Sequence, residues 1–140
     1  MTTLFLLMLA GMCNAVMDTL FSHYDISIFK KFNPLFWNPE ISWKNKWAQP
    51  YPQPAEDKWY YFGFVPPYKE RFPYSSTIFV FLTDAWHLFK FFMLTFIFLG
   101  VVLYTPMVSQ FADFFIYYIA YTFTFTMFYD YVLVRKEYRD

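Results

Sequence analysis

The chain has 140 residues, enough for one domain, and its 28% aromatic content with only 3 glycines is unusual for a soluble protein. Its 11 basic and 11 acidic residues cancel to a net charge of zero, so no general electrostatic attraction to nucleic acid is expected. Charged residues form 16% of the chain and are largely excluded from three apolar stretches, as a lipid bilayer requires. We therefore predict an all-α integral membrane protein in which residues 1–140 form a single membrane domain.

The first apolar stretch predicts a membrane-spanning helix at about residues 2–22, close to the ~20 residues that a bilayer requires. No basic residue precedes it and a methionine stands directly before Cys13, so we expect a retained helix rather than a cleaved signal peptide. Asn14, Asp18 and Ser22 recur at every fourth position and share one face of this helix. Hydrogen bonding to another helix explains Asn14 and Ser22, whereas a functional role is an equally good explanation for Asp18.

Residues 23–74 differ from the spans, because they contain most of the prolines and most of the tryptophans. Residues 28–32 predict a short amphipathic helix at the membrane interface, and Asn38 followed by Pro39 predicts the start of another short helix. We therefore expect an aromatic, proline-rich interfacial loop that carries short amphipathic helices.

Tryptophan and lysine alternate shortly after Asn38. Indole rings at headgroup depth beside lysines that face lipid phosphate are common at membrane interfaces. A plain membrane anchor is the simpler interpretation, and a specific headgroup site is the alternative. The candidate headgroup-binding residues are Trp43, Lys44, Lys46, Trp47 and Lys90.

The second apolar stretch predicts a helix at about residues 76–105, which is longer than the ~30 Å hydrocarbon layer requires. It carries Asp84, His87 and Lys90 at intervals of three residues. Because ionisable groups are costly in lipid, we expect these three side chains at one membrane interface, where Lys90 can extend toward headgroups.

The third span is predicted at about residues 108–134, followed by a basic tail at residues 135–140. The turn between the second and third spans has no basic residue, whereas residues 23–74 hold seven and the tail holds three of the 11. The positive-inside rule then predicts a multi-pass protein with its N-terminus outside and its C-terminus in the cytoplasm. The absence of a targeting segment favours a bacterial cytoplasmic membrane over an organelle.

Asp84 and His87 stand one helical turn apart, a spacing that suits an acid/base pair or two metal ligands. Three further groups are expected at the same depth, and they would complete a site for Zn, Mn or Fe. The candidate metal ligands are Asp18, His23, Asp84, His87 and Asp130, and the candidate catalytic pair is Asp84 and His87. As a structural alternative, Asp84 orients His87 or pairs with Lys90. Haem is disfavoured, because the second axial histidine would be the distant His23.

Three stretches of the chain are similar to a family of small, uncharacterised bacterial integral-membrane proteins. They read MCNAVMDTLFSHYDISIF at residues 12–29, NPEISWKNKW at 38–47 and STIFVFLTDAWHLFK at 76–90. The resemblance implies a location in a membrane, and it implies no activity.

Two functions fit these features. The first is a membrane protein whose Asp/His cluster at the cytoplasmic side binds a divalent metal or a lipid headgroup, with hydrolysis or transfer at the interface as an open question. The alternative is a non-catalytic structural or accessory subunit of a larger membrane complex. Both involve membrane lipids, and the aromatic helix faces predict a homo- or hetero-oligomer, because three helices cannot bury that much aromatic surface among themselves.

Overall fold

Three long helices dominate the computed structural model, which describes residues 1–54 and 68–138. They are α1 (Thr2–His23), α4 (Ala85–Val102) and α5 (Gln110–Thr126), the last continuing as a π-helix over Met127–Val132. Counted as the continuous helical stretches Thr2–Ile26, Ala85–Val102 and Gln110–Val132, all three are long and apolar enough to cross a membrane. The predicted all-α architecture with three candidate spans is confirmed.

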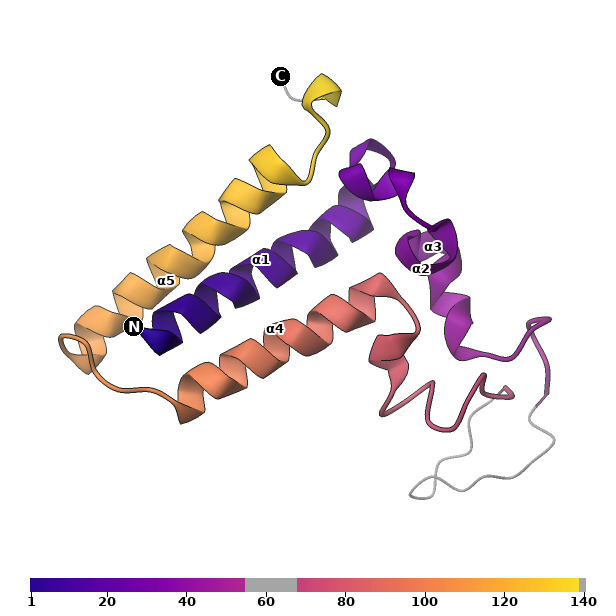
Figure 1. Cartoon of the computed structure of the whole chain (residues 1–140), viewed down its shortest axis with the longest axis horizontal. Coiled ribbons are helices and arrows are strands. Elements are labelled where there is room, and N and C mark those ends of the chain that lie inside the picture. The colour runs from indigo at the N-terminus through magenta and orange to yellow at the C-terminus, as the bar shows by residue number, and fades with distance from the viewer. Residues whose placement is uncertain (55–67, 139–140) are drawn as a thin grey trace.

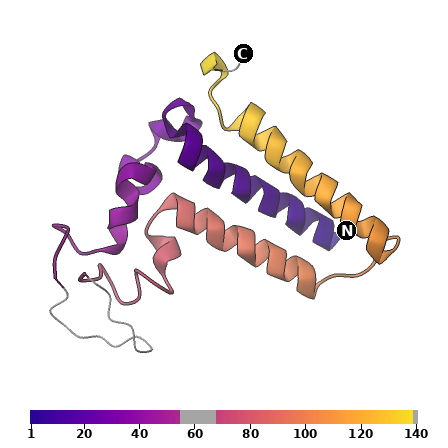
Figure 2. The same cartoon turned by 180° about the vertical axis from the view of Figure 1, so that it is seen from behind.

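Helix α1 lies between the other two long helices, parallel to α5 and antiparallel to α4 (Figures 1 and 2). It packs against both of them, whereas α4 and α5 make little contact with each other. The core is accordingly centred on α1, with Ala15, Val16 and Leu20 almost fully buried. The outer faces of α4 and α5 remain exposed and apolar, as expected for helices that face lipid.

Small residues let α1 approach its neighbours closely. A β-carbon added at Gly11 would lie only 2.6 Å from the backbone oxygen of Tyr121 in α5. On the α4 side, the Thr3 hydroxyl donates a hydrogen bond of 3.3 Å to the backbone oxygen of Gly100. This is the packing by which membrane helices associate without a hydrophobic driving force.

The second span is shorter than the predicted helix at residues 76–105, because α4 begins only after Asp84. Asp84 has an extended backbone and its side chain accepts a hydrogen bond of 3.0 Å from the His87 amide, so it caps the helix. The apolar residues before it form turns and the 3-10 helix Val80–Leu82. Hydropathy alone does not distinguish such a turn from a helix, whereas the Asp84 cap does.

Short helices occupy the loop between α1 and α4, as predicted. Asn38 caps α3 (Pro39–Ser42) by accepting from the Glu40 amide, in agreement with the sequence. Asn33 caps α2 (Pro34–Trp37) in the same way, and this helix is not among the predicted elements. The remaining short helices are Tyr24–Ile26, Ile28–Lys31, Trp43–Lys46 and Lys136–Tyr138.

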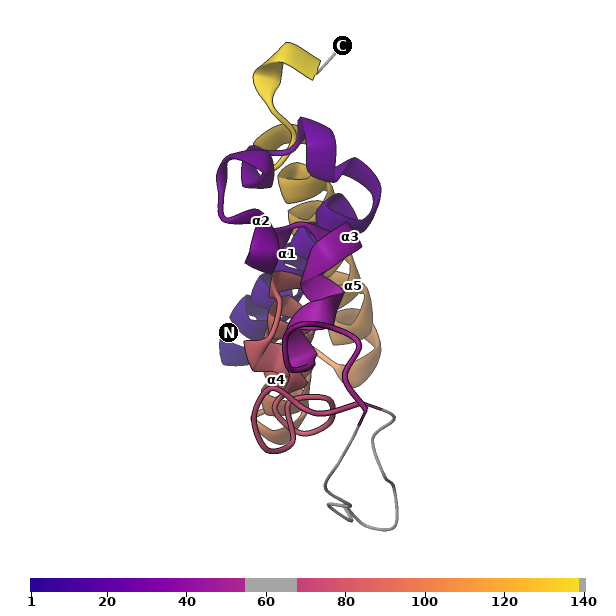
Figure 3. The same ribbon diagram turned by 90° about the vertical axis from the view of Figure 1, so that its right-hand side faces the viewer.

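The loop helices gather at the end of the bundle where α1 ends and α4 begins (Figures 1 and 3). Trp37 joins them to the bundle, because its ring stacks on Phe29 at a centroid distance of 4.7 Å and lies 6.1 Å from Phe89 of α4. Aromatic packing therefore fixes the described part of the loop against the helix ends.

Candidate functional site

Asp84 and His87 contact each other, as predicted, but their contact serves the start of α4. The Asp84 carboxylate is 2% exposed and its Oδ2 lies 2.7 Å from His87 Nδ1. The same carboxylate accepts bonds from the His87 amide and from the Thr83 hydroxyl, the latter at 3.2 Å. This geometry matches the alternative in which Asp84 orients His87, and their catalytic role stays a prediction.

The other candidate metal ligands do not join this pair. Asp18 and Asp130 are exposed on the outer faces of the bundle, and the His23 ring packs against Tyr129 at 5.3 Å. Within residues 1–54 and 68–138, no three His, Cys, Asp or Glu side chains form a group that could hold a metal ion. The five-residue metal site is therefore corrected for the described residues: Asp18 and Asp130 are exposed, whereas Asp84 is buried at the start of α4.

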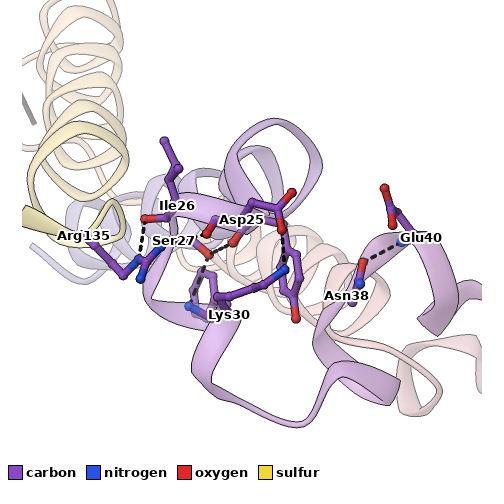
Figure 4. A network of polar contacts seen from close by, with 9 residues as sticks. Asp25, Ile26, Ser27, Lys30, Asn38, Glu40 and Arg135 are labelled. Carbon is purple, nitrogen blue, oxygen red and sulfur yellow. Dashed lines mark hydrogen bonds and ion pairs between the residues drawn. The ribbon is translucent and has the colours of Figure 1, made fainter. Parts of the chain in front are cut away.

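A polar junction near His23 connects the end of α1 to the segment that follows the π-helix (Figure 4). Arg135 donates from Nε to the backbone oxygen of Ile26 at 3.3 Å and from a terminal guanidinium nitrogen to the backbone oxygen of Asp25 at 3.0 Å. Lys30 forms an ion pair with Asp25, and this hydrogen bond raises the pKa of the Lys30 ammonium. Because both ends of that pair are largely exposed, we assign the junction a structural role.

A cavity of about 860 Å³ lies between the loop helices and the segment that leads into α4. Its size is within the range of small-molecule sites. Its walls are partly apolar, through Leu35, Phe36, Ile41, Trp47 and Leu82. Two basic residues, Lys44 and Arg71, also line it, and no acidic residue does among those that the structure describes.

Asn45 holds the two walls of this cavity together. Its side-chain amide donates to the backbone oxygen of Leu35 on one wall and to that of Thr83 on the other, the latter at 3.2 Å. Arg71 is brought to the cavity by backbone pairing, since its amide donates to the Lys46 oxygen at 3.1 Å. The cavity is thus built from segments 48 positions apart in the chain, Leu35 on one wall and Thr83 on the other.

Only some of the predicted headgroup residues line this cavity. Lys44 and Trp47 line the cavity. Lys46 lies over the Trp47 ring at 5.5 Å, Lys90 lies over the Trp86 ring at 4.8 Å, and neither is among the described lining residues. Trp43 donates from its indole to the Glu40 oxygen at 3.1 Å and is 40% exposed, as suits an interfacial anchor.

Arg71 was missed by sequence reasoning, because it stands in a proline-rich stretch without periodicity. Neither Arg71 nor Lys44 is in any of the ion pairs formed among the described residues. Two cations thus line one cavity with no carboxylate assigned to them in the part of the chain that is described.

Comparisons of the chain with protein-family models, with curated proteins and with solved structures gave no match. The resemblance to small bacterial membrane proteins therefore stays a prediction, and the function must be argued from the site.

Proposed function

We propose that this protein is a multi-pass membrane protein that binds the phosphate of an anionic phospholipid in the cavity lined by Lys44 and Arg71. One observation carries the proposal, namely two basic side chains on a partly apolar cavity without an acidic neighbour among the described lining residues. We propose binding rather than catalysis at this cavity, because neither Asp84 nor His87 is among its described lining residues.

The chemistry of the two cations suits a lipid phosphate. Arginine offers a planar set of donors that matches phosphate oxygens in pairs, and lysine adds a compact positive charge. Near an anionic membrane surface each such residue contributes about 1 kcal/mol of attraction. The apolar wall of Leu35 and Ile41 would cover the first carbons of the acyl chains.

The location of the cavity supports an interfacial ligand. Its lining residues belong to the loop helices and to the segment just before α4. These segments lie together at one end of the bundle (Figure 1). Exposed Trp43 and the charged loop residues suit the headgroup layer. We also propose that this end faces the cytoplasm, in accordance with the positive-inside rule.

Lipid binding by the purified full chain tests this function. Native mass spectrometry would compare phosphatidylglycerol with phosphatidylcholine for the wild type, Lys44→Gln and Arg71→Gln. We expect a preference for phosphatidylglycerol that each substitution weakens about fivefold, the equivalent of ~1 kcal/mol.

Lys136→Gln is the matched control, because Lys136 is an exposed cation at the same end of the bundle and does not line the cavity. If Lys136→Gln weakens binding as much as Arg71→Gln does, the attraction is diffuse and the site is refuted. Equal binding of the two lipids refutes it as well.

A second candidate, an accessory subunit of a membrane complex, is favoured by Asp18. This carboxylate is exposed on the surface of α1, within a candidate span, where an unpaired charge is costly. A partner helix that donates hydrogen bonds to it would remove this cost. Blue native electrophoresis of Asp18→Asn and Asp18→Leu tests this contact with a partner helix. Only the leucine variant should lose the larger assembly, because asparagine can still accept hydrogen bonds. An unchanged assembly in both variants refutes the contact.

A further inference from the structure

A second cavity lies at the opposite end of the bundle, where α4 turns into α5. It has a volume of about 390 Å³ and is lined by all three long helices, including Thr3, Leu7, Gly100, Asp113, Phe114 and Tyr117. Thr83, which precedes α4, lines the basic cavity and Gly100 near the end of α4 lines this one, so about 22 Å of helix separates the two. They are independent sites.

Asp113 is the charged residue of this cavity and is 1% exposed. Its Oδ2 accepts hydrogen bonds from the Tyr104 hydroxyl at 3.1 Å and from the Met107 amide at 2.8 Å, and its Oδ1 accepts one from the Val108 amide at 3.1 Å. Desolvation, and then the bond to Asp113, raise the pKa of the Tyr104 phenol, which keeps that donor protonated. Because Oδ1 accepts only this one hydrogen bond from Val108, it can accept another from a further donor.

Tyr117 supplies an unused donor in the same cavity. The residue is 9% exposed, and its hydroxyl makes no hydrogen bond of acceptable geometry. Thr3 is close to Tyr117 and its own proton goes to the Gly100 oxygen, but the two hydroxyls are not placed at hydrogen-bond geometry to each other. A buried hydroxyl without a partner costs more in hydrocarbon than in water, so a ligand oxygen at this point would be stabilised.

The cavity is accessible from the lipid side. Two of its lining residues, Val101 of α4 and Phe114 of α5, are 70% and 63% exposed. Since α4 and α5 make little contact with each other, a molecule dissolved in the bilayer can enter between them and rest on α1. The mostly apolar lining suits the chain of such a molecule.

We infer that this cavity binds an uncharged lipid that carries a hydroxyl group. The hydroxyl oxygen accepts a hydrogen bond from Tyr117, and its proton is donated to Asp113. No basic residue is among the described lining residues, so a phosphate head is disfavoured, and a carboxylate head is repelled by Asp113. A hydroxyl group satisfies a donor and an acceptor at once.

Photo-crosslinking of the full chain in phosphatidylcholine nanodiscs tests the inference. The probes are a diazirine-bearing hexadecanol, the corresponding hexadecane and the corresponding hexadecylamine, and the labelled residues are mapped by peptide mass spectrometry. We expect hexadecanol to label residues that line the cavity, such as Leu7 or Phe114. Loss of one hydrogen bond in Tyr117→Phe should reduce that labelling about tenfold.

Tyr117→Phe is expected to fold as the wild type does, because the hydroxyl that it lacks has no partner. Tyr118→Phe is the matched control, since Tyr118 is 62% exposed on the same helix and does not line the cavity, and its labelling should be unchanged. Equal labelling by hexadecane and hexadecanol, or full labelling of Tyr117→Phe, overturns the inference. Stronger labelling by hexadecylamine also overturns it, because the cavity would then be a cation site at Asp113.

Discussion

Replacement of Gly11 by alanine should separate α1 from α5. The added methyl group would lie 2.6 Å from the Tyr121 oxygen and 3.4 Å from its carbonyl carbon, whereas ordinary contacts begin at 3.4 Å. The helices must therefore part locally by about 0.8 Å (3.4 − 2.6), because the opposing atom belongs to the backbone and cannot rotate away. Overpacking of this kind costs about 1–3 kcal/mol, a factor of roughly 5 to 150 in the unfolding equilibrium.

Gly100→Ala provides the matched control on the α4 side of α1. Its methyl group would meet the Thr3 side chain at 3.6 Å, an ordinary contact, and alanine favours the helix by up to about 1 kcal/mol. Thermal unfolding of both variants in detergent measures the difference. We expect Gly11→Ala to lower the midpoint by about 3–10 °C while Gly100→Ala leaves it unchanged or raises it. Equal midpoints for the two variants would refute the close approach of α1 and α5.

Three further predictions concern the cap, the turn and the topology. If Asp84 acts as a helix cap, Asp84→Ala should destabilise the protein by about 1 kcal/mol in chemical unfolding, whereas Asp84→Asn should be nearly neutral because asparagine caps equally well; equal losses would contradict the cap. Because the pKa of the Tyr104 phenol is raised in the folded state, the contribution of this phenol to stability is fully present below the usual tyrosine value of 10.0 and is lost as the pH rises through the raised value. Tyr104→Phe should therefore show less alkaline destabilisation than the wild type in thermal scans. Parallel pH profiles of the two proteins would contradict this. In a Cys13→Ser background, a cysteine at Thr105 should react with an impermeant maleimide from outside intact cells and one at Lys136 only after lysis; the reverse pattern would invert the proposed orientation.

Local features of the chain were predictable because they depend on neighbours in sequence. Hydropathy located three candidate spans, and the Asn38-Pro39 pair located the start of α3. The equivalent Asn33-Pro34 pair is expected only to end the short helix at residues 28–32, whereas in the structure it also starts α2. The apolar run before Asp84 predicts a longer second span than the structure has. The cap signal was present in the sequence, but hydrophobicity outweighed it.

The site required tertiary structure. Sequence periodicity placed Asp18, Asp84 and Asp130 at one end of the bundle, but depth along a helix does not fix the direction in which a side chain points. In the structure Asp18 and Asp130 are exposed, whereas Asp84 is buried at the start of α4.

The two cavities also depend on contacts between distant segments. Asn45 and the backbone of Arg71 bring Lys44 and Arg71 to one cavity, and the turn bound by Asp113 sets Tyr117 beside Thr3. By itself, the sequence determined three helices long and apolar enough to span a membrane and an aromatic loop with short helices, because hydropathy and capping are local properties. Which polar groups share a cavity was decided only by the tertiary structure, because that depends on the rotation and separation of packed helices.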